Sequence, residues 1–207
     1  MLQEELVDIL VLNSGIKAEL KKLKNVFFTY KENMNYGNIK NLDIANGEGV
    51  RISLFVSGCT HHCKNCFNPE TWDFNYGKPF TKETEDNILK LLEPDYIQGI
   101  TLLGGEPMDP RNQPTLLELV KKIKLKFGDK KDIWGFTGYI LEKDLFEGGR
   151  AYCEDTKELL KHIDVLIDGP FVESLKDLNL KFRGSSNQRV INLKETLKQG
   201  KIILYLT

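Results

Sequence analysis

The 207-residue sequence is short of cysteine, of long apolar runs and of charge of one sign, and each shortage excludes a class of protein. Four cysteines are too few for a disulfide-stapled scaffold. The acidic start at Glu4 and Glu5 is unlike a secretory signal. The longest apolar stretches are far too short for a membrane span. The 29 basic and 30 acidic residues are well mixed, which argues against a nucleic-acid surface. We therefore expect a cytoplasmic protein with one core, in a reducing setting.

Three of the four cysteines stand close together. Cys59, Cys63 and Cys66 have the spacing C-x3-C-x2-C. Thiolates at this spacing can hold three irons of a cubic [4Fe-4S] cluster, and the fourth iron is then left without a protein ligand. An open iron of this kind can bind a small molecule by its amino and carboxylate groups. The alternative is a structural zinc site with Cys63 and Cys66 as one pair, completed by Cys59, His61 or His62, although such sites usually draw their second pair of ligands from a distant segment.

Apolar periodicity predicts strands that alternate with helices. The expected strands are 51–57, 97–103, 132–136, 163–167 and 201–206. The expected helices are 81–92, 114–127 and 155–162, the last of which begins with Asp155 and Glu158 at capping-box spacing. This alternation is typical of an α/β fold, with a mostly parallel sheet, right-handed crossovers and flanking helices.

Distinctive loops follow the predicted strands. They are the cysteine loop and the segments 104–107, 137–139 and 168–171. In whole or partial barrels the ends of parallel strands meet at one rim, where chemistry collects. Gly104 and Gly105 lack Cβ atoms, so their main chain can approach a ligand and hydrogen-bond the ammonium group of an amino acid. Glu106 can add a carboxylate partner.

The most diagnostic run is Arg183-Gly184-Ser185-Ser186-Asn187-Gln188-Arg189. With the flanks of the cysteine loop at 46–51 and 68–72, and with the segments 134–139 and 168–172, it makes the chain from about residue 34 onward resemble one family. That family is the activating proteins of anaerobic (class III) ribonucleoside-triphosphate reductase, which belong to the radical S-adenosylmethionine superfamily.

The resemblance implies a partial (βα) barrel of the radical S-adenosylmethionine type. It implies that Cys59, Cys63 and Cys66 hold a [4Fe-4S] cluster, which passes one electron to S-adenosylmethionine so that a glycyl radical forms in the reductase. The residues that it places against S-adenosylmethionine are Asn65, Phe67, Gly104, Gly105 and Glu106. The wider superfamily prefers an aromatic residue just before the third cysteine, whereas here Asn65 precedes it and Phe67 follows. A flavodoxin-like protein is the expected electron donor.

Other interpretations stay open. The target could be pyruvate formate-lyase or another glycyl-radical enzyme, and a different class of function is a zinc-stabilised binding module without catalysis. We expect His61 and His62 to be solvated or to support the metal ligands without binding metal. Arg183 and Arg189 could belong to a simple polar loop, bind a cofactor carboxylate or dock the partner.

The first part of the chain carries no family motif. Residues 1–33 have helical spacing at Leu2, Leu6 and Ile9, and a short basic patch at 21–24. We expect the radical enzyme domain to span 34–207, and residues 1–33 to be a dispensable extension or an upstream start that the cell does not use. Cys153 stands apart from the other cysteines, and we assign it no role.

Overall fold

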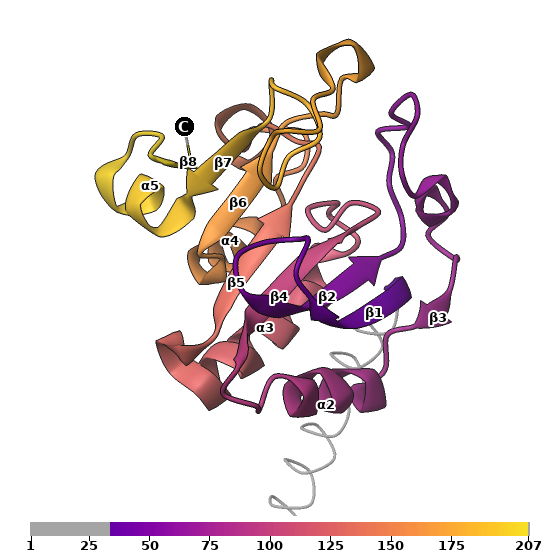
Figure 1. The fold of residues 1–207 in the computed structure, drawn as a ribbon, viewed down its shortest axis with the longest axis vertical. Coiled ribbons are helices and arrows are strands. Elements are labelled where there is room, and N and C mark those ends of the chain that lie inside the picture. The colour runs from indigo at the N-terminus through magenta and orange to yellow at the C-terminus, as the bar shows by residue number, and fades with distance from the viewer. Residues whose placement is uncertain (1–33, 207) are drawn as a thin grey trace, which may run out of the picture. The chain divides into compact units, whose positions relative to one another are not determined.

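The computed structural model describes residues 34–206, so the expected extension at 1–33 lies outside the described residues. Within this range eight strands form one sheet in the order β3-β1-β2-β4-β5-β6-β7-β8 (Figure 1). The strands are β1 Asn35–Asp43, β2 Val50–Val56, β3 Lys78–Pro79, β4 Ile97–Gly104, β5 Asp132–Phe136, β6 Val165–Asp168, β7 Arg189–Asn192 and β8 Leu204–Leu206. The α-helices are α2 Lys82–Leu91, α3 Gln113–Phe127, α4 Thr156–His162 and α5 Leu193–Gln199. Short helical turns are η1 Pro69–Trp72, η2 Gly128–Lys130, η3 Leu141–Leu145 and η4 Glu173–Leu175.

The centre of the sheet is parallel and its edges are antiparallel. Strands β2, β4, β5 and β6 pair in parallel, and α2, α3 and α4 lie in the crossovers between them. This confirms the predicted α/β alternation. The expectation of a mostly parallel sheet holds only for these four strands, because β1 and β3 are antiparallel at one edge and β7 and β8 at the other. The loop 44–49 turns the chain back before β2, and the loop 169–188 turns it back after β6. No α-helix therefore crosses the sheet between the two strands that each loop joins.

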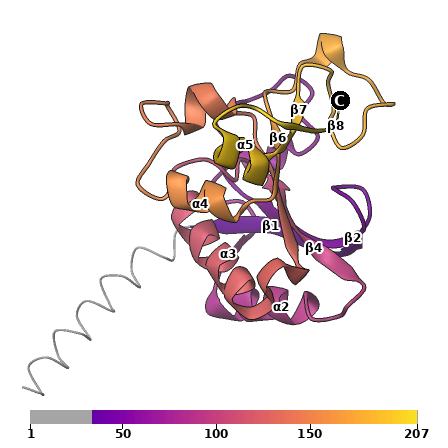
Figure 2. The ribbon, with the colours of Figure 1, turned by 90° about the vertical axis from the view of Figure 1, so that its left-hand side faces the viewer.

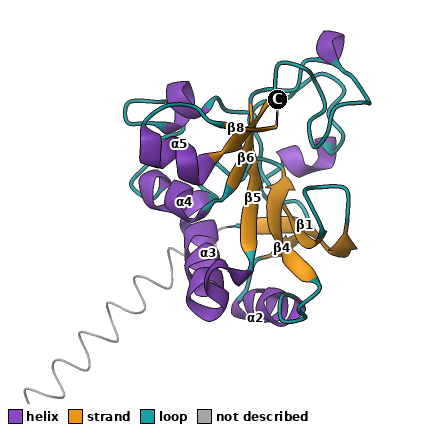
Figure 3. Cartoon of the chain, turned by 60° about the vertical axis from the view of Figure 1, so that its left-hand side comes forward, coloured by secondary structure: helices purple, strands orange, loops and turns teal. Residues whose placement is uncertain are grey.

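The helices cover one face of the sheet and enclose the main core. Figures 2 and 3 show α2, α3 and α4 on the same side of the strands. On α3, the apolar stripe of the predicted helix 114–127 is buried at Leu116, Leu119, Val120 and Ile123, and Phe127 at its end is partly buried. These side chains pack in one cluster with strand residues such as Ile100. Among residues 34–206, none of the helices combines the length and the apolar content needed to cross a membrane.

Side-chain caps mark some of the predicted helix starts. Thr81 caps α2, where its hydroxyl accepts a hydrogen bond from the main-chain N–H of Thr84, 3.3 Å away, and Thr84 bonds back to complete a capping box. The capping box predicted at Asp155 is wrong. Asp155 is the N-cap residue of α4 but has helical backbone angles, and its side chain makes no capping hydrogen bond.

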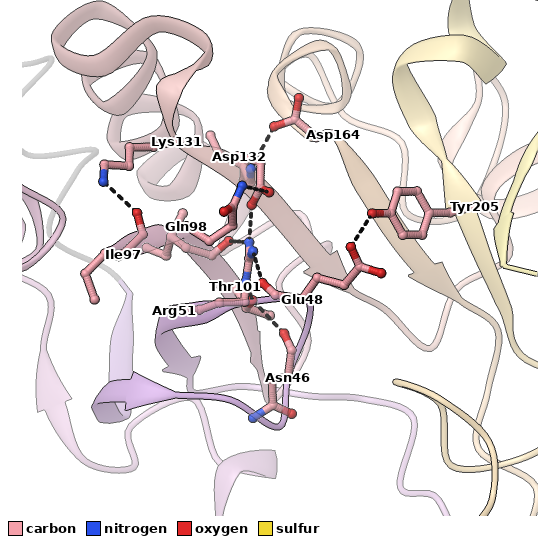
Figure 4. Close-up of polar contacts among 12 residues, drawn as sticks. Asn46, Glu48, Arg51, Ile97, Gln98, Thr101, Lys131, Asp132, Asp164 and Tyr205 are labelled. Atoms are coloured by element: carbon pink, nitrogen blue, oxygen red, sulfur yellow. Dashed lines mark hydrogen bonds and ion pairs between the residues drawn. The ribbon is translucent and has the colours of Figure 1, made fainter. Parts of the chain in front are cut away.

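A buried cation holds the amino ends of the central strands together (Figure 4). Arg51 at the start of β2 is fully buried, and its guanidinium donates to the hydroxyl of Thr101 at 2.8 Å and to the carbonyl of Glu48 at 3.0 Å. It also pairs with the carboxylate of Asp132 at the start of β5. Removing one partner of such a pair leaves a buried charge uncompensated. Within the segment 46–51, which contributed to the family resemblance, Arg51 therefore has a structural task at the amino ends of the central strands.

Candidate active site

A pocket of about 760 Å³ lies where the parallel strands end. Its floor includes Phe55 of β2, Leu103 of β4 and Phe136 of β5. Phe55 pairs with Leu103 in the register of β2 and β4, and Phe136 follows the residue that pairs with Leu102. The three side chains are thus neighbours on the sheet face that the helices leave open, and they give the pocket an apolar base.

The cysteine loop forms one wall of this pocket. Cys59, Cys63 and Cys66 all line it, and all three are free thiols. The loop is closed at its base, because the main-chain N–H of Cys59 donates to the carbonyl of Trp72 at 3.1 Å. A tight turn brings the N–H of Cys66 within 3.2 Å of the carbonyl of Cys63. The predicted grouping of the three cysteines around one cavity is therefore present in the structure.

Main-chain N–H groups act on the cysteine sulfurs. The amide of Asn68 lies 3.4 Å from the sulfur of Cys66, and the amides of His61 and Phe171 act to lower the pKa of Cys59 and Cys63. Amide donors of this kind stabilise thiolates that ligate iron–sulfur clusters and tune their potential. Burial acts the other way on the bare thiols: it raises the pKa of Cys59 to about 12 and also raises that of Cys63. The two sulfurs need a bound cation to stay ionised.

The donor set of the pocket is three thiols. Within residues 34–206, no three His, Cys, Asp or Glu side chains, these cysteines included, are placed as a ready site for one metal ion. The three thiols instead surround a cavity that also has an apolar base. Soft thiolates that face a shared space suit an iron–sulfur cluster, whose irons occupy separate corners.

The carboxylate of Glu106 joins three of the loops at the rim. Glu106 is 1% exposed. One oxygen accepts hydrogen bonds from the N–H of Met108 and the hydroxyl of Thr137, both at 2.8 Å. The other accepts from the N–H of Gly138 at 2.8 Å and contacts Nε2 of His61 at 2.9 Å. Because four donors engage this carboxylate, it holds the cysteine loop, its own loop and the loop after β5 in one arrangement.

His61 is part of that arrangement. Its side chain is 10% exposed, and its ring lies 4.4 Å from the ring of Tyr139. A Cβ atom on Gly138 would lie 2.7 Å from the ring, so this glycine leaves the space that His61 occupies. Of the two expectations for His61, solvation is not found, because its ring is largely buried against Glu106 and Tyr139. His62 is exposed and packs its ring against Trp72 at 4.6 Å.

Gly104 and Gly105 allow β4 to end against the cysteine loop. Gly104 has φ +109°, and a Cβ atom there would lie 2.7 Å from the Cα atom of Phe55. A Cβ atom on Gly105 would lie 2.6 Å from the carbonyl oxygen of Gly58, which instead accepts a 2.8 Å hydrogen bond from the N–H of Glu106. The close neighbour that requires glycine is the main chain of β2 at Gly104 and the main chain that leads into the cysteine loop at Gly105.

Comparison with known proteins identifies the family. The 4Fe-4S single cluster domain matches residues 45–191. The anaerobic ribonucleoside-triphosphate reductase-activating protein of Escherichia coli K12 is 45% identical over 163 residues, which cover 78% of this chain and 100% of that protein. The proteins of the same name from Vibrio cholerae and Enterobacteria phage T4 are 43% and 42% identical, over 75% and 76% of this chain and 96% and 93% of their own lengths. The chain belongs to the anaerobic ribonucleoside-triphosphate reductase-activating protein family.

The residues that the family resemblance places against a cofactor are distributed unevenly around the pocket. Gly104, Gly105 and Glu106 line it, and Phe67 lines its mouth with 84% of its surface exposed. Asn65 is exposed, has φ +58° and is not among the lining residues. Their contacts with a bound molecule stay predictions.

The polar motif of the family divides into two parts. Asn187 and Gln188 brace the loop after β6, since their side-chain amides donate to the carbonyls of Pro170 at 2.8 Å and Gly169 at 3.0 Å. Arg189 begins β7 and pairs with Asp168. These residues secure the fold of the wall, whereas Arg183 is among the residues that line the pocket.

Sequence reasoning missed the apolar floor of the pocket. Phe55 lies between Ser53 and Ser57, on the face of β2 opposite the one that packs in the main core. A large aromatic residue among serines on that face was the available signal. The hydrogen bond of His61 had no comparable signal, because Glu106 is distant in sequence.

Proposed function

We propose that this chain activates an anaerobic ribonucleoside-triphosphate reductase by generating a glycyl radical in it, through reductive cleavage of S-adenosylmethionine. The observation that carries the proposal is the set of three cysteines around one pocket in a chain that matches the 4Fe-4S single cluster domain. When bound, the cluster supplies the single electron that breaks a carbon–sulfur bond of the sulfonium. The finer fold that we propose is a partial (βα) barrel, of which β2, β4, β5 and β6 are the parallel portion.

The residues of the chain bind, orient and exclude water. We propose that Cys59, Cys63 and Cys66 ligate three irons, and that Asn65, Phe67, Gly104, Gly105 and Glu106 form the S-adenosylmethionine site. Because the carboxylate of Glu106 is engaged by four protein donors, its part is to fix the loops that shape the site, with any direct contact made by its main chain. The apolar floor keeps water from the reacting centre.

The mouth of the pocket suits a protein substrate. Phe67 and Leu178 line it with 84% and 87% of their surfaces exposed, on two different loops. Large exposed apolar side chains at a site entrance are typical of a surface that a partner covers. A glycine of the partner can approach a recessed centre closely, because it has no side chain. The names of the relatives indicate the reductase as that partner, and we propose a flavodoxin-like protein as the electron donor, in a cytoplasmic, reducing setting.

A partner assay tests the proposal. The anaerobically reconstituted chain is mixed with S-adenosylmethionine, a chemical reductant and either the anaerobic reductase or pyruvate formate-lyase. We expect the glycyl-radical doublet in electron paramagnetic resonance only with the reductase, and loss of the doublet in Cys59→Ser, Cys63→Ser and Cys66→Ser. A doublet with pyruvate formate-lyase alone would reassign the target. Purified protein that holds zinc and no iron or sulfide would support a binding module in place of an enzyme.

A further inference from the structure

Arg183 differs from every other arginine of the chain. The sequence has five arginines, all within the described range. Four of them pair with carboxylates: Arg51 with Asp132, Arg111 with Asp109, Arg150 with Asp144, and Arg189 with Asp168 and Glu142. Arg183 has no carboxylate within 4.0 Å among residues 34–206, and it is the arginine that lines the pocket.

The guanidinium of Arg183 is held in place but largely unused. Its Nη1 donates to the carbonyl of Gln188 at 3.0 Å, while its Nε is buried without a hydrogen-bond partner. The loop beneath it is rigidly braced, since Oε1 of Gln188 accepts from the N–H groups of Gly184 at 2.9 Å and Ser185 at 3.2 Å. A positioned side chain with free donors is pre-organised for a ligand.

Two carboxylates line the pocket, and neither lies within 4.0 Å of this cation. Glu106 is committed to four donors, and the exposed Asp177 has Oδ1 engaged by the N–H of Asn179 at 2.8 Å. A partly desolvated charge with an unsatisfied N–H is costly unless something binds it. The planar fork of a guanidinium matches a carboxylate better than it matches a point charge.

We infer that Arg183 binds the carboxylate of the methionine portion of S-adenosylmethionine. The inference rests on the proposed function, because it assigns a part of the same site to a cofactor that the function requires. Arg183 shares the pocket with Cys59, Cys63 and Cys66, near which the amino-acid end of that cofactor belongs if it meets the open iron. With this assignment the two arginines of the family motif have different roles: Arg189 secures the wall of the pocket, and Arg183 contacts the ligand.

Binding of two ligands to the anaerobically reconstituted protein tests this. S-adenosylmethionine carries the carboxylate, and its decarboxylated analogue retains the sulfonium, the adenosine and the amine. In Arg183→Gln we expect affinity for S-adenosylmethionine to fall about 10- to 100-fold, with affinity for the analogue changed by less than about twofold. Arg183→Lys, which keeps the charge and loses the fork, should give an intermediate loss. Iron content and the visible spectrum of each variant confirm that the cluster is retained.

Arg150→Gln is the matched control. It removes one arginine whose side chain is 65% exposed, paired with Asp144 and outside the pocket lining, so both ligands should bind as in the unmodified protein. Equal loss of both ligands in Arg183→Gln, or no loss of either, would overturn the inference. Unchanged S-adenosylmethionine affinity with a weakened glycyl-radical yield would assign the guanidinium to a carboxylate of the reductase. If the unmodified protein bound no S-adenosylmethionine, the proposed function itself would fail, and this outcome is distinct from the others.

Discussion

Replacing Glu106 by glutamine tests whether its carboxylate organises the site. The side chain keeps its size, but an NH₂ group takes the place of one of two oxygens that each accept two hydrogen bonds. If the NH₂ group replaces the oxygen that faces Met108 and Thr137, the hydroxyl of Thr137 can rotate to accept a hydrogen bond, and the N–H of Met108 is left facing another donor. If the NH₂ group replaces the oxygen that faces Gly138 and His61, the ring of His61 can accept in its other tautomer, and the N–H of Gly138 is left unpaired.

One buried main-chain donor loses its partner in either orientation. An unsatisfied buried donor costs about 1–3 kcal/mol, and the remaining hydrogen bonds lose their charge assistance. We therefore expect Glu106→Gln to lower the free energy of unfolding by about 1–3 kcal/mol. The assay is urea unfolding of the metal-free protein under anaerobic conditions, followed by circular dichroism.

Glu147→Gln is the control, since Glu147 is exposed and a surface substitution of this kind changes stability by less than about 0.5 kcal/mol. The two variants carry the same chemical change, so their difference isolates the buried hydrogen bonds. If Glu106→Gln unfolds at the same urea concentration as the control, the carboxylate does not hold the three loops together, and the assignment is refuted.

Three further predictions concern the pocket. Cys63→Ser should lose most of its iron after anaerobic reconstitution while Cys153→Ser keeps it, and equal iron in the two variants by chemical analysis would contradict the ligand assignment. Gly105→Ala should unfold at lower urea concentration and retain less cluster, because its Cβ atom would lie 2.6 Å from the carbonyl oxygen of Gly58; normal unfolding and iron content would show that the loops yield without cost. Phe67→Ala should leave the unfolding free energy within about 0.5 kcal/mol, because the side chain is 84% exposed, yet weaken S-adenosylmethionine binding. Unchanged affinity in equilibrium dialysis would remove Phe67 from the cofactor site.

The central elements were predictable because their signals are local. The apolar stripe of α3 and the alternation of β2 report burial directly, and β5 occupies the residues that the sequence indicated. β1 and β7 were missed for a physical reason, whereas the edge strand β8 lies within the predicted strand 201–206. β1 is mostly polar and half exposed, and β7 is only four residues long, so neither shows a period that distinguishes it from a loop.

The site was predictable in its ligands and not in its hydrogen bonds. The spacing of the cysteines and the glycines after β4 located two loops at one rim, and the parallel strands bring those loops together. The partners of Glu106 come from three loops, so their convergence depends on the tertiary fold. The two arginines of the family motif are alike in sequence, and only the positions of Asp168 and Glu142 show that Arg189 is already paired.

The most direct test of the central claim is the electron paramagnetic resonance spectrum of the reduced, anaerobically prepared protein before and after addition of S-adenosylmethionine. If one iron of the cluster has no side-chain ligand, the [4Fe-4S] signal should change shape when the cofactor is added. The signal should be lost in Cys63→Ser. A cluster signal that the cofactor leaves unaltered would contradict the account.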